Sequence, residues 1–160
     1  MGFRGSRLNR RLVLGAGLFA GFSGTAWAQT APARDLTVFK TPTCPCCNGW
    51  IDHMRQAGFT TVVTIVPDLQ PIRSVRGLPD ALASCHTGIV GGYLVEGHVP
   101  AQDVIRLLTE RPAAIGLAVP AMPLGSPGME TPQGHRDPYD TLLVLRSGAT
   151  RVFARHNQPV

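Results

Sequence analysis

The chain has 160 residues, which is enough for one domain, and it carries a formal net charge of +5 at pH 7. Four arginines lie within the first 11 residues, whereas all ten acidic residues lie beyond residue 28, so residues 29–160 carry eleven basic and ten acidic side chains, a net charge of +1. This balance provides no basic patch, and we therefore expect neither nucleic acid nor an anionic membrane surface as a partner.

The first 28 residues have the pattern of a secretory signal peptide. A basic start is followed by an apolar run from Leu12 to about Ala20 and then by small residues that end in an A-x-A motif at Ala28. The apolar run is shorter than the roughly 20 residues of a membrane-spanning helix, so we expect cleavage after Ala28 and no membrane span in the mature chain. Arg10 and Arg11 before Leu12 also fit a twin-arginine signal. Sec and twin-arginine export both stay open, and both predict a periplasmic protein.

Hydrophobic periodicity and turn residues predict eight elements after a short leader. In chain order they are a strand at 36–40, a helix at 46–58, a strand at 61–66, helical turns at 72–76 and 80–83, strands at 87–90 and 93–96, and a helix at 101–109. Gly91-Gly92 is typical of a hairpin turn between two strands. Pro100 is typical of a helix start.

The order β-α-β-α-β-β-α is the topology of a thioredoxin-like fold, so the predicted class is α/β. Further along the chain, the sequence predicts a loop rich in Pro, Gly and Met at 116–130, a polar loop at 131–138, and a β-hairpin that pairs 141–145 with 150–154. We expect a single thioredoxin-like metal-binding domain over residues 29–160, with this loop and hairpin as a C-terminal extension.

Three of the four cysteines lie in Cys44-Pro45-Cys46-Cys47, between the first predicted strand and the first predicted helix. At a helix start, unpaired N–H groups and the positive end of the dipole favour thiolate over thiol. An even number of cysteines in an exported protein also allows disulfides, here in three possible pairings. A structural cross-link gains most by closing a long loop, however, and these three cysteines are too close together for that. The cluster therefore indicates a metal site or a redox site.

Cys46 favours the metal site. A redox dithiol such as Cys44 and Cys47 needs one attacking and one resolving sulfur, and a third thiol beside them would scramble the exchange. Adjacent Cys46 and Cys47 point in different directions, so they are better placed to reach two ions than to chelate one. Soft thiolates select Cu(I), although Zn²⁺ accepts them too. We interpret the pattern as a site for several copper ions bridged by shared thiolates, with Cu(I) as the reduced form.

Cys85 lies immediately before the predicted third strand, in Ser84-Cys85-His86-Thr87. In a thioredoxin-like fold this position faces the C-x-x-C motif, so we expect a fourth sulfur opposite the other three. A buried free cysteine and a disulfide with Cys44 are the alternatives. His86 is expected to point to the other face of the strand, either as a ligand or as a hydrogen-bonding neighbour.

Met122 and Met129 lie in the loop rich in Pro and Gly. Thioether sulfur is a soft ligand for Cu(I), and the alternative is that methionine fills a gap beneath the loop. The two interpretations stay open for Met122, and gap-filling is favoured for Met129. The other histidines are weaker candidates, and His98, which precedes a helix, is expected to cap that helix or to face water.

Four blocks in order, at residues 38–50, 82–87, 90–100 and 116–130, resemble the periplasmic CopG-type copper-resistance family, formerly a domain of unknown function and unrelated to the DNA-binding repressors of that name. The resemblance implies a thioredoxin-like fold that binds a cysteine-bridged cluster of several copper ions. It also implies a role in copper tolerance through interconversion of Cu(I) and Cu(II). The residues carried over are Cys44, Cys46, Cys47 and Cys85.

The sequence therefore predicts a periplasmic copper-binding protein that buffers Cu(I) or passes electrons as a copper oxidoreductase. Its expected partners are copper ions and other periplasmic copper-handling proteins. Two alternatives stay open: a thiol–disulfide oxidoreductase that uses Cys44 and Cys47, and a metallochaperone that transfers single ions.

Overall fold

The computed structural model describes residues 1–2 and 33–159. The predicted signal peptide, with its choice between Sec and twin-arginine export, therefore lies outside the described residues, apart from Met1 and Gly2. Contacts divide the chain into the units Met1–Thr30 and Ala31–Val160, and the fold below is that of the second unit.

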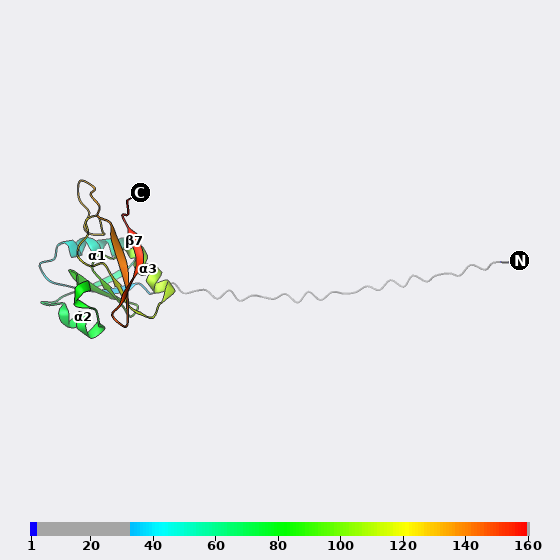
Figure 1. Cartoon of the computed structure of the whole chain (residues 1–160), viewed down its shortest axis with the longest axis horizontal. Coiled ribbons are helices and arrows are strands. Elements are labelled where there is room, and N and C mark those ends of the chain that lie inside the picture. Colours follow the sequence, from blue (N-terminus) through cyan, green and yellow to red (C-terminus); the bar gives the residue numbers. More distant parts are fainter. Residues whose placement is uncertain (3–32, 160) are drawn as a thin grey trace. The chain divides into compact units, whose positions relative to one another are not determined.

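The second unit is a mixed α/β structure built on one sheet of seven strands in the order β2-β1-β3-β4-β5-β6-β7 (Figure 1). The elements are β1 (Asp35–Lys40), α1 (Cys46–Gln56), β2 (Thr60–Ile65), α2 (Gln70–Arg76), the 3-10 turn η1 (Asp80–Leu82), β3 (His86–Val90), β4 (Tyr93–Glu96), α3 (Ala101–Glu110), β5 (Ala114–Ala118), β6 (Tyr139–Leu145) and β7 (Thr150–His156). The pairs β1–β2 and β4–β5 are parallel, and the other neighbours are antiparallel.

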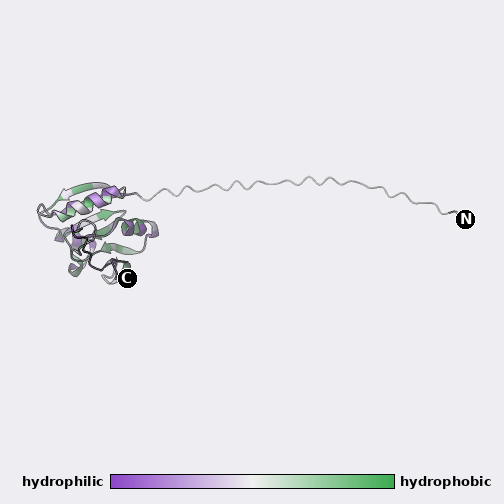
Figure 2. Cartoon of the chain, turned by 90° about the horizontal axis from the view of Figure 1, so that it is seen from above, coloured by the Kyte–Doolittle hydropathy of each residue, from purple (hydrophilic) through white to green (hydrophobic). Residues whose placement is uncertain are grey.

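Helices pack on both faces of the sheet, whereas the edge strand β2 is largely exposed. Trp50 and Met54 of α1 share a buried cluster with Leu107 of α3, so these two helices pack on the same face. On the other face, Leu78 follows α2 and packs with Leu94 of β4. Each such side chain stabilises the fold by roughly 1.5–3 kcal/mol through burial. Hydrophobic residues predominate in the strands, whereas the helices carry both kinds (Figure 2).

The α/β class is confirmed, and each predicted element lies within two residues of an observed one. The sequence prediction missed β5, because Ala114–Ala118 contains two alanines and a glycine, which have low strand propensity. A register shift between Ala114 and Gly116 further interrupts its pattern. Since β5 joins β4 to β6, the C-terminal hairpin continues the main sheet rather than extending from it.

In the described part of the chain, no helix is long and apolar enough to cross a membrane.

Candidate metal centre

Antiparallel pairing of β1 with β3 brings the cysteines together. Lys40, the last residue of β1, lies opposite His86, the first residue of β3, so the loop after β1 and the segment before β3 leave the same edge of the sheet. The sulfur atoms of all four cysteines lie within 4.8 Å of one another. Cys46 Sγ is 3.5 Å from Cys44 Sγ and 3.9 Å from Cys85 Sγ. The expected proximity of Cys85 to the other sulfurs is confirmed.

The start of α1 sets the arrangement of the three clustered cysteines. Pro45 is the N-cap residue, and its carbonyl oxygen accepts a hydrogen bond from Asn48 N at 3.1 Å. This turn buries Cys44 and Cys47 and leaves Cys46 partly exposed. Adjacent Cys46 and Cys47 thus lie in different environments at the first helical turn, which matches the expectation that they point in different directions.

Cys44 and Cys47 are joined by a disulfide, with their Cα atoms 5.6 Å apart, while Cys46 and Cys85 are free thiols. The alternative pairing of Cys44 with Cys85 is therefore wrong for this structure. Cysteine ligates metals as the thiolate. A metal centre that uses all four sulfurs therefore requires this disulfide to be reduced.

Two fully buried histidines lie against Cys85. His86 Nδ1 is 3.3 Å and His98 Nε2 is 3.1 Å from Cys85 Sγ. The His86 ring lies 4.3 Å from the Trp50 ring and 5.1 Å from that of His98, measured between centroids. His98 was expected to cap a helix or to face water, and that expectation is wrong: its side chain is turned into the cysteine cluster.

The hydrogen bonds of His98 determine which of its nitrogens carries the proton. Its Nδ1 lies 2.8 Å from the carbonyl oxygen of Pro127, and because a carbonyl only accepts, Nδ1 must donate. Nε2 therefore presents a lone pair to Cys85. Metal-ligating histidines are commonly oriented by a second hydrogen bond of this kind.

Burial keeps both imidazoles in the neutral form that binds metals. Desolvation, with a smaller contribution from His98, lowers the pKa of His86 to about 3. Desolvation also lowers the pKa of His98. Both rings are therefore neutral at pH 7, as ligands or as acceptors from a thiol.

Cys85 is held as a thiol in the metal-free site. Burial, reinforced by neighbouring Cys46, raises the pKa of Cys85 to about 12. The thiol can donate its proton to His98 Nε2, which is an acceptor. A soft cation that binds here must displace that proton, since ligating thiols are deprotonated by the metal.

Met122 adds a fifth sulfur, with its Sδ 4.0 Å from Cys46 Sγ and its side chain 48% exposed. Its loop packs closely on the first turns of α1 at Gly128, where φ is +84°. A Cβ atom on Gly128 would lie 2.5 Å from Trp50 N and 2.9 Å from the Cys46 carbonyl oxygen. This contact between backbones fixes the loop over the cysteines.

The remaining candidates make other interactions. Met129 is partly buried, and its backbone bonds to Gly125 and Ser126 within the loop. The histidine side chains accept from or pair with other groups: His53 with Ala101 N at 3.0 Å, His135 with Asp137 at 3.0 Å, and His156 with Asp103 at 2.8 Å.

The site's donor atoms are soft. Among the described residues, the two groups with metal-ligand spacing, Cys44–Cys46–Cys47–Cys85 and Cys85–His86–His98, contain no carboxylate. Thiolate, thioether and imidazole suit Cu(I) and Zn²⁺, whereas Mg²⁺ and Ca²⁺ prefer oxygen.

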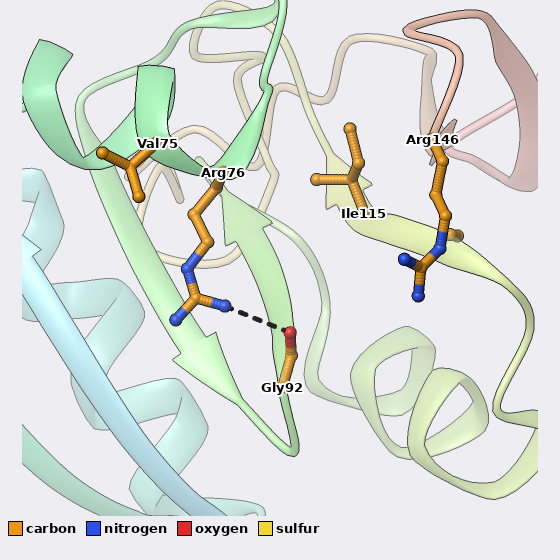
Figure 3. A pocket seen from close by; sticks show the side chains of 6 residues that line it. Val75, Arg76, Gly92, Ile115 and Arg146 are labelled. Atoms are coloured by element: carbon orange, nitrogen blue, oxygen red, sulfur yellow. Dashed lines mark hydrogen bonds between the residues drawn. The ribbon is translucent and has the colours of Figure 1, made fainter.

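A shallow pocket of about 200 Å³ lies elsewhere, around Arg76, Gly92 and Arg146 (Figure 3). Arg76 donates to the carbonyl oxygen of Gly92 at 3.3 Å. Gly92 belongs to the β3–β4 turn, at the end of β3 remote from Cys85. The pocket is therefore separate from the cysteine cluster.

Comparison with known proteins agrees with the chemistry of this site. A family described as "Protein of unknown function, DUF411" matches residues 82–129, which include Cys85, His98 and Met122. No curated protein sequence matches significantly.

Two solved structures match over most of their length. "Copper resistance protein copG- Form 1" is 39% identical with a TM-score of 0.74, and the alignment covers 79% of this chain and 99% of that one. Form 2 is 40% identical with a TM-score of 0.72, and the alignment covers 76% and 97%. Identity at this level over nearly the whole of each structure establishes relationship rather than mere likeness of fold. The chain belongs to the family of the copper resistance protein CopG.

Proposed function

We propose that this chain is a periplasmic copper-binding protein that contributes to copper tolerance by holding several copper ions on Cys44, Cys46, Cys47 and Cys85. The observation that carries the proposal is the convergence of four sulfurs from two distant segments within 4.8 Å. The copper resistance relatives support copper as the ion. The signal-peptide pattern in the first 28 residues supports a periplasmic location.

The scaffold of this function is a thioredoxin-like domain over residues 29–160. Its support is the order β1-α1-β2-α2-β3-β4-α3 along the chain. The sheet order β2-β1-β3-β4, in which β1 and β2 are parallel and β3 is antiparallel to β1, supports it further. Such a domain carries its reactive cysteines at the start of α1, which here begins at Cys46.

Several ions fit this cluster better than one. Cys46 is flanked by Cys44 at 3.5 Å and by Cys85 at 3.9 Å, so its thiolate can bridge two ions. Cys47 is buried, and further donors are supplied by His98 beside Cys85 and by Met122 beside Cys46. A bridging arrangement shares four negative charges among several Cu(I) ions and limits the charge left in a partly buried site.

Loading requires two chemical changes in the protein. An external dithiol reduces the Cys44–Cys47 disulfide to two thiols and is itself oxidised to a disulfide. The thiols, Cys85 among them, then release their protons as soft ions bind. Copper at these sulfurs could pass one electron at a time between Cu(I) and Cu(II), and the buried histidines provide donors that both oxidation states accept.

Metal analysis tests the proposal. We expect protein purified anaerobically from the periplasm to contain more than one copper per chain, measured by mass spectrometry of metal and protein together. Replacing any one of the four cysteines by Ser should lower this ratio. His98→Gln should weaken Cu(I) binding by about tenfold, whereas His53→Gln, which alters a histidine that contacts α3, should leave it unchanged. A ratio at or below one copper per chain, or zinc in its place, would contradict the proposal.

One observation favours a second function, thiol–disulfide oxidoreductase: the Cys44–Cys47 disulfide spans the N-terminus of α1. For this function, the reduced, metal-free protein should reduce the disulfides of insulin, and Cys46→Ser should retain that activity. We expect insulin reduction to be slow, because Cys46 and Cys85 compete for the exchange. Fast reduction that survives Cys46→Ser would replace the copper proposal.

A further inference from the structure

A buried ionic network lies behind Cys85, on the face of the sheet that α2 covers. Glu96, the last residue of β4, is completely buried. Its Oε1 accepts from Ser84 N at 2.7 Å and from Arg73 Nη2 at 2.6 Å, and its Oε2 accepts from Thr87 Oγ1 at 2.6 Å. Ser84 and Thr87 are the residues on either side of Cys85 and His86. The Glu96 carboxylate therefore accepts hydrogen bonds from both ends of the segment 84–87.

The network also holds the peptide bond that enters Cys85. Arg73 Nη2 donates to the carbonyl oxygen of Ser84 at 2.5 Å, and that carbonyl belongs to the peptide that joins Ser84 to Cys85. Residues 83–85 belong neither to η1 nor to β3. The segment that carries Cys85 thus lacks a strand or helix of its own, and the Glu96–Arg73 pair supplies the fixed contacts instead.

Ser84 extends the network to the methionine loop. Its hydroxyl donates to the carbonyl oxygen of Ala121 at 2.7 Å, and Ala121 immediately precedes Met122. Gly97, with φ at +71°, allows this approach, because a Cβ there would lie 2.7 Å from Ser84 Oγ and 2.5 Å from the Val119 carbonyl oxygen. One residue therefore couples the position of Cys85 to that of Met122.

A contribution to stability does not by itself explain why Glu96 and Arg73 form a buried ion pair. Burial of an ion pair costs desolvation energy, and apolar replacements of similar volume are often as stable. Desolvation raises the pKa of Glu96, although the bonds from Thr87 and Arg73 oppose that shift. Arg73 Nε is buried and has no hydrogen-bond partner among the residues that the structure describes. Burial of the Glu96–Arg73 ion pair therefore costs free energy. Its hydrogen bonds are made to residues next to Cys85, which indicates a role in placing that cysteine.

We propose that Glu96 and Arg73 are positioning residues of the metal centre. They fix Ser84 and thereby hold Cys85 Sγ and the Met122 loop at their distances from Cys46. The consequence for copper rests on the function proposed above, whereas the consequence for sulfur geometry concerns the metal-free protein and is tested without copper.

The test measures how readily Cys46 and Cys85 react with each other. In the full chain with Cys44→Ser and Cys47→Ser, only this pair of thiols remains, and diamide removes two hydrogens to form their disulfide. Alkylation and mass spectrometry give the rate. We expect Glu96→Ala to slow the reaction by at least about tenfold, because small displacements of reacting atoms have large effects. Glu96→Gln should restore most of the rate, since its amide oxygen still accepts from Ser84 N.

Asp103 provides the matched control. It is a buried carboxylate that accepts hydrogen bonds from Thr141 Oγ1 at 2.7 Å and from His156 Nε2 at 2.8 Å, and it joins α3 to β6 and β7. Asp103→Ala should lower the melting temperature without slowing formation of the Cys46–Cys85 disulfide. The proposal is overturned if Glu96→Ala reacts at the parent rate, or if both alanine variants slow the reaction equally. If Glu96→Ala does not fold, Thr87→Val takes its place, because it removes one hydrogen bond to Glu96. Thr87→Val should slow formation of the disulfide about threefold, and an unchanged rate would overturn the proposal.

Copper binding by the four-cysteine protein separates the two proposals. If the parent chain binds no copper while Glu96→Ala still slows the disulfide, the proposed function fails and the positioning role stands. If the parent binds copper, Glu96→Ala should weaken Cu(I) binding by about tenfold, within the range for residues that orient ligands. Unchanged Cu(I) affinity in that variant would overturn the role of the pair in the metal centre.

Discussion

The two segments that supply the sulfurs are held in different ways. Cys44, Cys46 and Cys47 are placed by the local backbone: Pro45 caps α1, and the helix itself sets the spacing. Cys85 has no regular structure of its own and is placed by contacts from β4, α2 and the methionine loop. The first segment is expected to keep its shape even when its surroundings loosen. The second is expected to depend on the whole fold, so the assembled site reports on the integrity of the domain.

The largest effect that tests this difference is the loss of the second segment's sulfur. We expect Cys85→Ser to weaken Cu(I) binding by at least about 100-fold, because it removes a ligand rather than an orienting group. Competition with a coloured Cu(I) chelator measures the affinity. If the first segment alone still binds copper as tightly as the parent, the two segments do not form one centre.

Gly128→Ala tests the contact that holds the methionine loop against the first segment. Both strain at positive φ and collision with Trp50 N and the Cys46 carbonyl oxygen should lower the free energy of unfolding, by about 3 kcal/mol in total. Gly134→Ala is the control, because Gly134 also has a positive φ, +70°, but a Cβ there meets nothing within 4 Å. That variant should lose only about 1 kcal/mol. Urea unfolding measures both, and equal losses would contradict the close packing.

Acid should loosen the second segment through His86. The pKa of His86 is about 3 when folded, against 6.5 as the ordinary value, so the unfolded chain binds more protons between these limits. The contribution of neutral His86 to stability is thus fully present above pH 6.5 and is lost as the pH falls below it, by up to about 1.4 kcal/mol per pH unit.

Urea unfolding of the metal-free protein at pH 7, 6 and 5 measures this slope. His86→Phe should flatten it, because Phe fills the ring's place beside Trp50 and cannot be protonated. His135→Gln, at an exposed position, should leave it unchanged. The lowered pKa of His98 leaves part of the slope in His86→Phe, whereas a slope as steep as that of the parent would contradict the assignment to His86.

The smallest effect separates the two methionines. Met122→Leu should weaken Cu(I) binding by about threefold, since a thioether is a weak ligand and Met122 lies at the exposed side of the cluster. Met129→Leu should leave the affinity unchanged, because its loop contacts are made by its backbone. Equal effects of the two substitutions would assign both methionines to packing.

The first segment could be predicted from the sequence because its signals are local. Cys46 begins a helix with apolar residues at helical spacing, and the three cysteines lie within one turn. The position of Cys85 could also be predicted, since the β-α-β-α-β-β-α order fixes which loops share an edge of the sheet.

His98 and Glu96 could not be predicted as part of the site. His98 turns inward because Gly97 adopts a positive φ and because Pro127 offers a carbonyl oxygen 29 residues further along the chain. Glu96 sits in a strand where an acidic residue is typical of a solvated face, and its partner Arg73 is on α2. Neither the contact of His98 with Pro127 nor that of Glu96 with Arg73 is indicated by a periodic pattern in the sequence. Strand β5 was missed for a related reason, because its small residues are required by close contacts with the neighbouring strand β4 and give no strand pattern of their own.

The continuity of the sheet has a consequence for the path of an incoming ion. The loop over the cysteines spans residues 119–138 and is tied at each end to a strand of the same sheet, β5 before it and β6 after it. Moving this loop aside would break the packing of Gly128 against the first turns of α1 and the hydrogen bond from Ser84 to Ala121. An ion arriving from solvent can therefore meet the exposed thioether of Met122 and the partly exposed thiols of Cys46 and Cys85, whereas Cys47 and His98 are buried behind the surface. These three sulfur atoms are the ligands through which delivery and release would begin.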